Sequence, residues 1–130
     1  MYHAETHNII VSAMPVYIDE RSDPDNANFF WAYRIVIQNE SDRSVQILRR
    51  YWHITDGNGS VEIVSGEGVV GETPTIPPGE SYDYTSGCPL TTSSGIMTGK
   101  FYLVDDTGNE LEIAIPTFSL DLPDITPTYN

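Results

Sequence analysis

Residues 66–71 read Gly66-Glu67-Gly68-Val69-Val70-Gly71, and residues 72–79 continue as Glu72-Thr73-Pro74-Thr75-Ile76-Pro77-Pro78-Gly79. The first six residues have the G-x-G-x-x-G spacing of a dinucleotide-binding loop. Such a loop must follow a strand and open a helix, because the helix N-terminus holds the pyrophosphate. Three prolines within residues 74–78 exclude that helix, since each removes a backbone donor and clashes with the preceding turn. We therefore predict that the glycines form a connection or a bulge between β-strands.

The residues upstream of this stretch alternate between apolar and polar side chains. Residues 29–39 have a period of two, which predicts a strand with one buried face that carries Trp31, Tyr33 and Ile37. The turn at residues 56–59, Asp-Gly-Asn-Gly, contains both an Asp-Gly and an Asn-Gly step, which is the strongest short-range signal for a β-hairpin. A returning strand follows it and runs into the glycine stretch.

Residues 45–55 predict a long strand between these two features. Strict alternation places Leu48, Trp52 and Ile54 on one face together with Arg50. The odd-numbered side chains then share the opposite face: Val45, Ile47, Arg49, Tyr51 and His53.

Further strand patterns cover the rest of the chain, and no window has a helical period. They lie at residues 9–18, where Pro15 indicates an edge strand or a bulge, and at residues 80–86, 95–104 and 110–115, with a last short strand near Phe118. Seven or eight short strands with frequent turns predict an all-β, antiparallel β-sandwich of the immunoglobulin or fibronectin type III-like class. We expect one domain over residues 1–130, with a core at about 9–123, a loose N-terminus at 1–8 and a loose tail at 124–130.

The composition is strongly acidic. The chain has 19 acidic residues against 6 basic ones, for a net charge of −13. This balance argues against nucleic acid and against an anionic membrane surface as partners, because both are bound through Lys and Arg. Cys88 is the single cysteine, so no disulfide forms within the chain, and residues 1–8 contain no apolar signal segment. We therefore expect a cytoplasmic protein.

Two segments and a series of single positions form a combined pattern: residues 50–59, residues 66–74, and Pro15, Tyr17, Tyr33, Ile35, Ile37, Asn39, Ile76, Pro78, Gly79, Glu80, Tyr82, Tyr84, Ser86, Gly87, Leu90, Gly95, Met97, Gly99, Ile115, Pro116, Thr117, Phe118 and Leu120. This pattern resembles the ApaG domain family, from about Ile9 to Pro123. The family commonly has an Arg-His-Trp step where this chain has Arg50-Tyr51-Trp52. A role of that histidine is therefore not carried over.

The resemblance implies a fold and a functional class. ApaG domains are similar to fibronectin type III sandwiches, and bacterial members are linked to cobalt resistance and magnesium efflux. In eukaryotes the domain is appended to F-box and polymerase-interacting proteins, as an interaction module. No catalytic residue is carried over, so the resemblance implies a non-enzymatic module that acts through a protein partner.

The glycine stretch also supports an alternative, in which the protein binds a phosphate or a nucleotide. Backbone amides of Gly66, Gly68 and Gly71 would form an anion-binding nest without a helix, helped by Arg49 or Arg50 from the preceding strand. The architectural interpretation of the glycines is favoured over this one.

Adjacent aromatic residues are the candidates for contacting a partner. Neighbouring strand residues point to opposite faces, so at least one residue of Phe29-Phe30-Trp31 and one of Tyr51-Trp52 should point outward or be covered by a loop. Tyr51, Trp52, Phe30 and Trp31 are therefore candidate anchors for a protein partner. The alternative is a sheet face covered by the C-terminal segment around Phe118. An exposed sheet edge would allow a homodimer as well as a monomer.

The sequence shows no pattern for a dedicated metal site or for catalysis. His3, His7 and His53 are scattered, which does not fit a zinc site. The paired carboxylates belong to predicted turns, which leaves only a weak, exposed Mg²⁺ or Co²⁺ site open. Cys88 has no basic neighbour in sequence that would lower its pKa, so we expect no cofactor and no catalytic residue.

Overall fold

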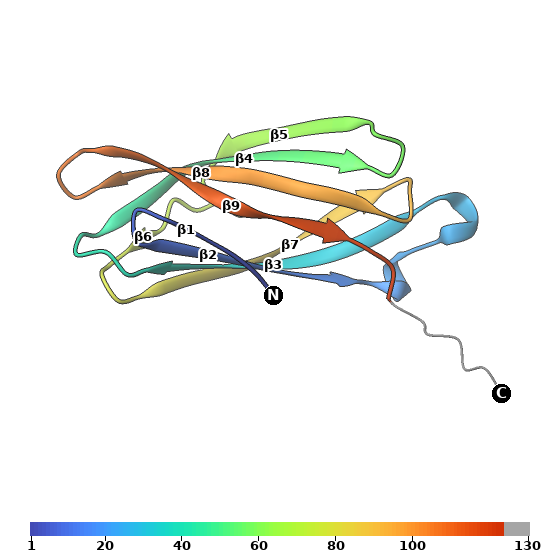
Figure 1. Cartoon of the computed structure of the whole chain (residues 1–130), viewed down its shortest axis with the longest axis horizontal. Helices are drawn as coiled ribbons and strands as arrows, with labels where there is room; N and C mark the ends of the chain where they lie inside the picture. Colours follow the sequence, from blue (N-terminus) through green and yellow to red (C-terminus); the bar gives the residue numbers. More distant parts are fainter. Residues whose placement is uncertain (124–130) are drawn as a thin grey trace.

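The computed structural model describes residues 1–123, and within them nine β-strands form two antiparallel sheets that pack face to face (Figure 1). The strands are β1 (Tyr2–Thr6), β2 (Ile9–Tyr17), β3 (Phe29–Asn39), β4 (Val45–Asp56), β5 (Val61–Glu67), β6 (Thr75–Ile76), β7 (Ser81–Leu90), β8 (Gly95–Asp105) and β9 (Glu110–Leu120). One sheet has the order β1-β2-β3-β7 and the other β5-β4-β8-β9, with β6 beside β4. The predicted all-β sandwich is confirmed, with nine strands in residues 1–123 where seven or eight were predicted. The predicted tail at 124–130 lies outside the described residues.

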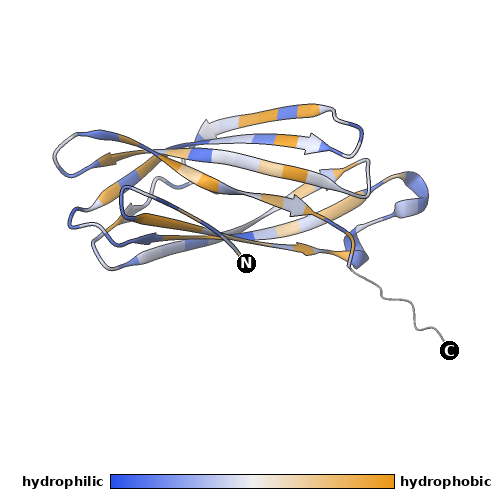
Figure 2. Cartoon of the chain, viewed as in Figure 1, coloured by the Kyte–Doolittle hydropathy of each residue, from blue (hydrophilic) through white to orange (hydrophobic). Residues whose placement is uncertain are grey.

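The core lies between the two sheets and is built from alternating residues of each strand. On β3 the buried positions are Trp31, Tyr33, Ile35 and Ile37, which confirms the period of two. Figure 2 shows apolar and polar residues following one another along the strands. The largest fully buried side chains come from both sheets: Trp31, Phe101, Phe118, Ile9, Ile35, Ile37, Ile47, Ile76, Met97, Leu103, Ile113 and Leu120.

The predicted faces of β4 are wrong in the first part of the strand, because β4 contains an irregularity. The pairing of β4 with β8 shifts register between Ile47 and Arg49, so one residue of β4 is extra at this point. Val45 and Ile47 are therefore buried before the shift, and Trp52 and Ile54 after it. As a result the side chain of Arg50 points toward the inside of the sandwich.

The N-terminus is ordered, in contrast to the predicted loose segment. His7 and Asn8 both have positive φ angles, of 53° and 63°, and form a tight turn that returns β1 onto β2. The hydroxyl of Tyr2 lies 3.0 Å from the hydroxyl of Ser119, which ties β1 to the other sheet. The sequence predicts an edge strand or a bulge at Pro15. β2 lies between β1 and β3, but Pro15 lies beyond the stretch that β1 covers, so β2 has a free edge only in this part.

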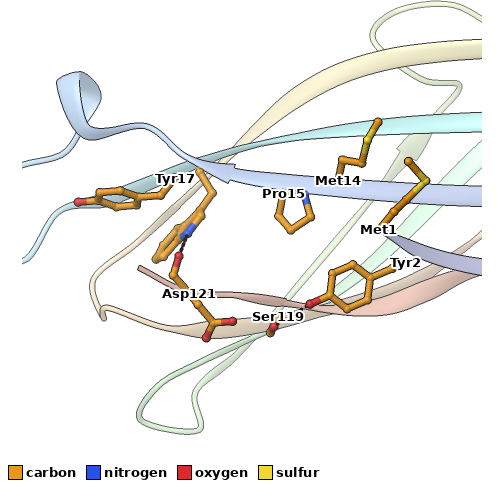
Figure 3. A pocket seen from close by; sticks show the side chains of 8 residues that line it. Met1, Tyr2, Met14, Pro15, Tyr17, Ser119 and Asp121 are labelled. Carbon is orange, nitrogen blue, oxygen red and sulfur yellow. Dashed lines mark hydrogen bonds between the residues drawn. The ribbon is translucent and has the colours of Figure 1, made fainter. Parts of the chain in front are cut away.

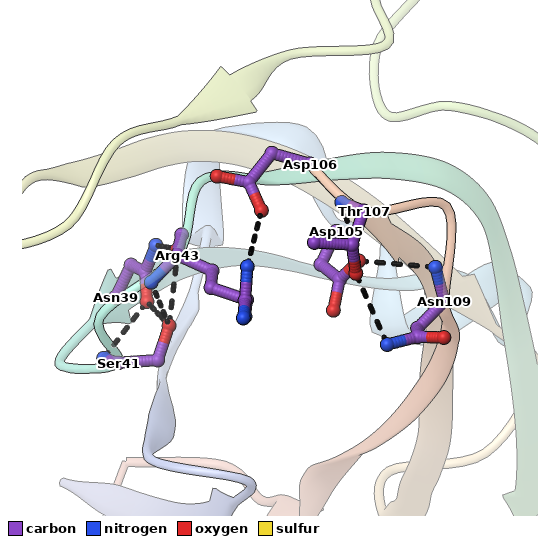
Figure 4. A network of polar contacts seen from close by, with 7 residues as sticks. All are labelled: Asn39, Ser41, Arg43, Asp105, Asp106, Thr107 and Asn109. Atoms are coloured by element: carbon purple, nitrogen blue, oxygen red, sulfur yellow. Dashed lines mark hydrogen bonds and ion pairs between the residues drawn. The ribbon is translucent and has the colours of Figure 1, made fainter.

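Asn39 joins three segments at one end of the sandwich (Figure 4). Its side-chain amide donates to the carbonyl of Arg43 at 2.7 Å and to that of Ile76 at 2.9 Å, while its side-chain oxygen accepts from the backbone amide and the hydroxyl of Ser41. Arg43 also forms an ion pair with Asp106 at 3.3 Å, which links the β3–β4 turn to the β8–β9 turn. The buried amide of Asn39 therefore fixes the path of the chain around β6.

Candidate functional site

The glycine stretch forms a β-hairpin turn. β5 ends at Glu67, and Val69 and Glu72 then exchange two backbone hydrogen bonds of 2.8 and 2.9 Å. Between them Val70 and Gly71 have φ angles of 42° and 81°, as a type I′ turn requires. No helix follows Gly71, since the chain continues into the short strand β6. The predicted connection between strands is confirmed.

Gly68 is the position in this turn where no other residue fits. It has a φ of 61°, and a Cβ atom at this position would overlap the backbone carbonyl of Glu72. Its amide donates to the carbonyl of Leu48 at 2.7 Å, which fastens the hairpin to β4. Gly71 also has a positive φ, but the space around it is open. The glycines are therefore explained by backbone conformation and close packing.

Arg50 lies under this hairpin and binds its carbonyl groups. Its Nη1 atom donates to the carbonyl oxygens of Glu67 and Gly68 at 2.9 and 3.1 Å. A Cβ atom on Gly66 would come within 3.1 Å of both Nη1 and Nη2, so this glycine lies against the guanidinium group. The structure thus brings Arg50 and the glycines together, but the hairpin offers carbonyl acceptors to the arginine. The amides of Gly68 and Val69 are already donated to backbone carbonyls.

The outer face of the sheet that contains β4 carries a group of aromatic and basic side chains, of which Arg49 is exposed and the others are half-buried. Tyr51 on β4 and Tyr102 on β8 lie on either side of Lys100, whose Nζ atom is 5.4 Å from one ring centroid and 5.6 Å from the other. Arg49 and His53 extend this group along β4 on the same face. We call these five residues the tyrosine face.

Lys100 is held in place by a carboxylate. Its Nζ atom forms an ion pair of 2.6 Å with Glu112 of β9. This pair, with a smaller contribution from Tyr102, raises the pKa of the Lys100 ammonium. Arg49 has no ion-pair partner among residues 1–123, so its charge is open to a partner.

Shallow hollows lie on both sides of Tyr51. One, of about 240 Å³, includes Arg49, Ser65 and Tyr102 among its lining residues. The other, of about 310 Å³, is lined by Tyr51, His53, Thr98, Gly99 and Lys100. Beside them β5 exposes Ile63, at 57% of its surface. The tyrosine face is therefore an uneven surface of mixed polarity.

The structure separates the four aromatic candidates for partner binding. Trp31 and Trp52 are only 1% and 3% exposed, so the prediction that they could anchor a partner is wrong. Both tryptophans are instead covered by the C-terminal segment, which was the alternative prediction. The Trp31 indole donates to the carbonyl of Asp121 at 2.8 Å, and the Trp52 ring contacts Phe118 edge to face. Phe30 is half-buried, with the Arg21 guanidinium 4.2 Å from its ring centroid. Tyr51 remains the candidate with an open surface beside it.

The sequence also left residues of the tyrosine face unidentified. Lys100 and Tyr102 lie on the outward-facing positions of β8, directly opposite Tyr51 and Arg49 of β4. The spacing of two residues between Lys100 and Tyr102 predicts that they share one face of their strand. Only the pairing of β4 with β8 shows that this is the same sheet face as that of Tyr51.

A larger hollow lies where the chain leaves the core at Asp121 (Figure 3). It measures about 410 Å³, and Met1, Met14 and Pro15 lie along its wall, with Trp31 behind the Asp121 carbonyl. Apart from the exposed Asp121, its walls carry no charged side chain. The shape of this hollow follows from the end of β9 lying against β1 and β2.

A cleft between the edge strands β5 and β7 leads into the core, and we call it the β5–β7 cleft. It has a volume of about 270 Å³ and is lined by Arg50 and Trp52 from one sheet and by Tyr33, Ser86 and Cys88 from the other. Burial raises the pKa of the Cys88 thiol to about 11. Burial also raises the pKa of the Tyr33 phenol, although the neighbouring Ser86 hydroxyl opposes this effect. Both groups therefore stay protonated near neutral pH.

The described residues contain no group of three or more His, Cys, Asp or Glu side chains arranged to hold a metal ion. His3 faces the hydroxyl of Ser12 at 3.3 Å, and His53 lies alone on the tyrosine face. The same part of the chain has two short 3-10 helices, at Asp19–Arg21 and Pro24–Asn26, and no helix there has the length and apolar character to cross a membrane.

Comparison with known proteins identifies the family. Residues 19–105 match the model of the ApaG domain. The protein named Protein ApaG from Mesorhizobium japonicum is 55% identical over 130 residues, and that from Methylocella silvestris is 52% identical over 130 residues, in each case covering the whole of both chains. A crystal structure of a Bordetella pertussis protein described as ApaA superposes with a TM-score of 0.88 at 41% identity, covering 90% of this chain and 95% of that one. The chain therefore belongs to the ApaG domain family.

Proposed function

We propose that this protein is a non-enzymatic binding module that engages a protein partner through the tyrosine face. The observation that carries the proposal is the arrangement of Tyr51, Lys100 and Tyr102 on an open sheet surface, with a hollow on each side of Tyr51. Tyrosine is enriched among the residues that dominate binding energy, because its ring is apolar and its hydroxyl still forms a hydrogen bond.

The charge of this face supports a partner segment that contains carboxylates. The chain as a whole carries a net charge of −13, yet two of its six Lys and Arg residues, Arg49 and Lys100, lie on this one surface. Arg49 is exposed and is not paired within residues 1–123. A guanidinium group binds a carboxylate through two parallel hydrogen bonds, which would fix the orientation of the partner.

The chemistry of the remaining side chains supports a role without catalysis. The single thiol, that of Cys88, is buried and has a raised pKa of about 11, so it is a poor nucleophile near neutral pH. The acidic residues of the turn at Asp105 hold the turn itself, since the Asp105 carboxylate accepts hydrogen bonds from Thr107 and from the amide of Asn109.

Family resemblance adds a cellular context, in which the protein bears on cobalt resistance and magnesium efflux. We place this effect on the partner, because the described residues offer no clustered metal ligands. A cell that lacks the protein should then change its sensitivity to Co²⁺, and the wild-type protein should restore it. If a variant with a disabled tyrosine face also restores the Co²⁺ sensitivity of the wild type, the cation effect does not depend on this surface.

The binding role is tested by affinity capture from the native cell with three forms of the full chain. The double variant Tyr51→Ala/Tyr102→Ala removes both rings of the tyrosine face, and Val16→Ala removes an exposed apolar side chain from the other sheet. We expect one protein to be retained by the wild type and by Val16→Ala and to be lost by the double variant. Equal retention by all three forms would contradict the proposal.

A further inference from the structure

The β5–β7 cleft contains a positive charge that the described part of the chain does not neutralise. Arg50 lines the cleft and is half-buried, and its hydrogen bonds go from Nη1 to two neutral carbonyl groups. No carboxylate among residues 1–123 pairs with it, and its Nε and Nη2 atoms donate to no group there. A half-buried guanidinium group whose charge is not neutralised favours an anion as its partner.

A second group in the same region lacks a hydrogen-bond partner. Tyr84 is 8% exposed, and its buried hydroxyl has no hydrogen-bond partner among residues 1–123. Tyr33, Arg50 and Tyr82 act on this hydroxyl electrostatically, and of these Tyr33 and Arg50 line the cleft. Tyr84 also shares the inward face of β7 with Ser86 and Cys88, because alternate residues of a strand point the same way. The Tyr84 side chain therefore lies beside the cleft, next to Ser86 along the inward face of β7.

A buried hydroxyl without a hydrogen-bond partner costs free energy. An anionic ligand would give this hydroxyl an acceptor and would also neutralise the nearby charge of Arg50. We propose that the β5–β7 cleft binds a small oxyanion, a carboxylate or a phosphate. Arg50 supplies the charge, and the hydroxyls of Tyr84, Tyr33 and Ser86 supply further donors. The other residues of this site lie away from the tyrosine face, although Arg50 also lines the hollow that contains Arg49 and Tyr102.

One charged residue of the cleft opposes such a ligand. Glu62 of β5 lines the cleft as well, and its exposed carboxylate repels anions that approach Arg50. It therefore lowers the affinity of the site, and its neutralisation should raise it.

The test is a pair of NMR titrations of the full chain, one with acetate and one with inorganic phosphate. We expect saturable shifts of the backbone amides of Tyr33, Ser86 and Cys88 with at least one of the two anions. Tyr84→Phe should weaken that binding by about tenfold, as expected for loss of a hydrogen bond to a charged group. This variant removes only a hydroxyl without a partner, so its fold is preserved.

Two further variants complete the design. Tyr82→Phe is the matched control, because its hydroxyl lies two residues along the same strand and donates to Glu72 instead. It should leave the affinity unchanged, and Glu62→Gln should increase it. Response to one anion only identifies which oxyanion the cleft takes. Absence of saturable shifts with both anions would overturn the proposal, as would shifts confined to Gly66, Gly68 and Gly71 that persist in Tyr84→Phe.

Discussion

Single buried polar side chains hold the turns of this sandwich together. Asn39 is fully buried and uses both ends of its side-chain amide, donating to Arg43 and Ile76 and accepting from Ser41. Because these partners would be left without hydrogen bonds, Asn39→Ala should lower the free energy of unfolding by about 2–4 kcal/mol. Urea denaturation measures this loss. Asn58→Ala, in the exposed turn between β4 and β5, is the control and should change stability by less than about 0.5 kcal/mol.

The buried thiol of Cys88 gives a prediction that depends on pH. Its pKa is raised to about 11 by burial, whereas an unfolded thiol has a pKa of about 8.5. The folded state therefore holds the thiol proton more tightly than the unfolded state does. Keeping Cys88 protonated contributes to the free energy of unfolding, and this contribution is complete below about pH 8.5 and is lost as the pH rises toward 11. At pH 8 the native thiol should react with iodoacetamide far more slowly than the same chain in denaturant. Equal rates in the two states would show that Cys88 is accessible.

The glycine hairpin between β5 and β6 makes a prediction at the scale of one element. Gly68 and Gly71 both have positive φ, but only at Gly68 would a Cβ atom overlap backbone. We expect Gly71→Ala to cost about 1–2 kcal/mol for the left-handed conformation alone, and Gly68→Ala to cost more. Thermal unfolding of both variants decides this. Equal losses would show that close packing at Gly68 is unimportant.

The same turn contains a residue that its conformation does not favour. Val70 has a φ of 42° and an exposed side chain, and β-branched residues rarely adopt this region. Type I′ turns prefer Asn-Gly at their two central positions. Val70→Asn should therefore raise the melting temperature, by an amount that corresponds to about 1 kcal/mol. A lower melting temperature would indicate that the Val70 side chain is needed where it lies.

The elements differ in how well the sequence predicts them. β3 is recovered residue by residue, because its alternation is unbroken from Phe29 to Asn39. In β4 the register shift after Ile47 reverses the faces, and nothing in the sequence marks it, since Leu48 suits either face of a strand. β1 is missed because Tyr2–Thr6 lacks a run of β-branched residues. The positive φ values of His7 and Asn8 create its hairpin, and Asn8 was the available signal.

At the scale of the whole molecule, the sequence predicts strands and their faces better than it predicts which strands lie side by side. The rule that strand neighbours point to opposite faces predicts that at least one of Tyr51 and Trp52 points outward, and the structure shows that Trp52 is the buried one. Sequence alone cannot show which strand lies beside β4, so the contribution of Lys100 and Tyr102 depends on the order β5-β4-β8-β9. The burial of Trp31 likewise depends on a distant segment, because its indole bonds to Asp121.

The tyrosine face is tested most directly by site-specific photocrosslinking in the native cell. A benzophenone-bearing amino acid is introduced separately at Tyr51, at Tyr102 and at Val16, which is exposed on the other sheet. We predict that the same protein is crosslinked from Tyr51 and from Tyr102 and that no adduct forms from Val16. Adducts of equal yield from all three positions, or from Val16 alone, would contradict the assignment of this face as the binding surface.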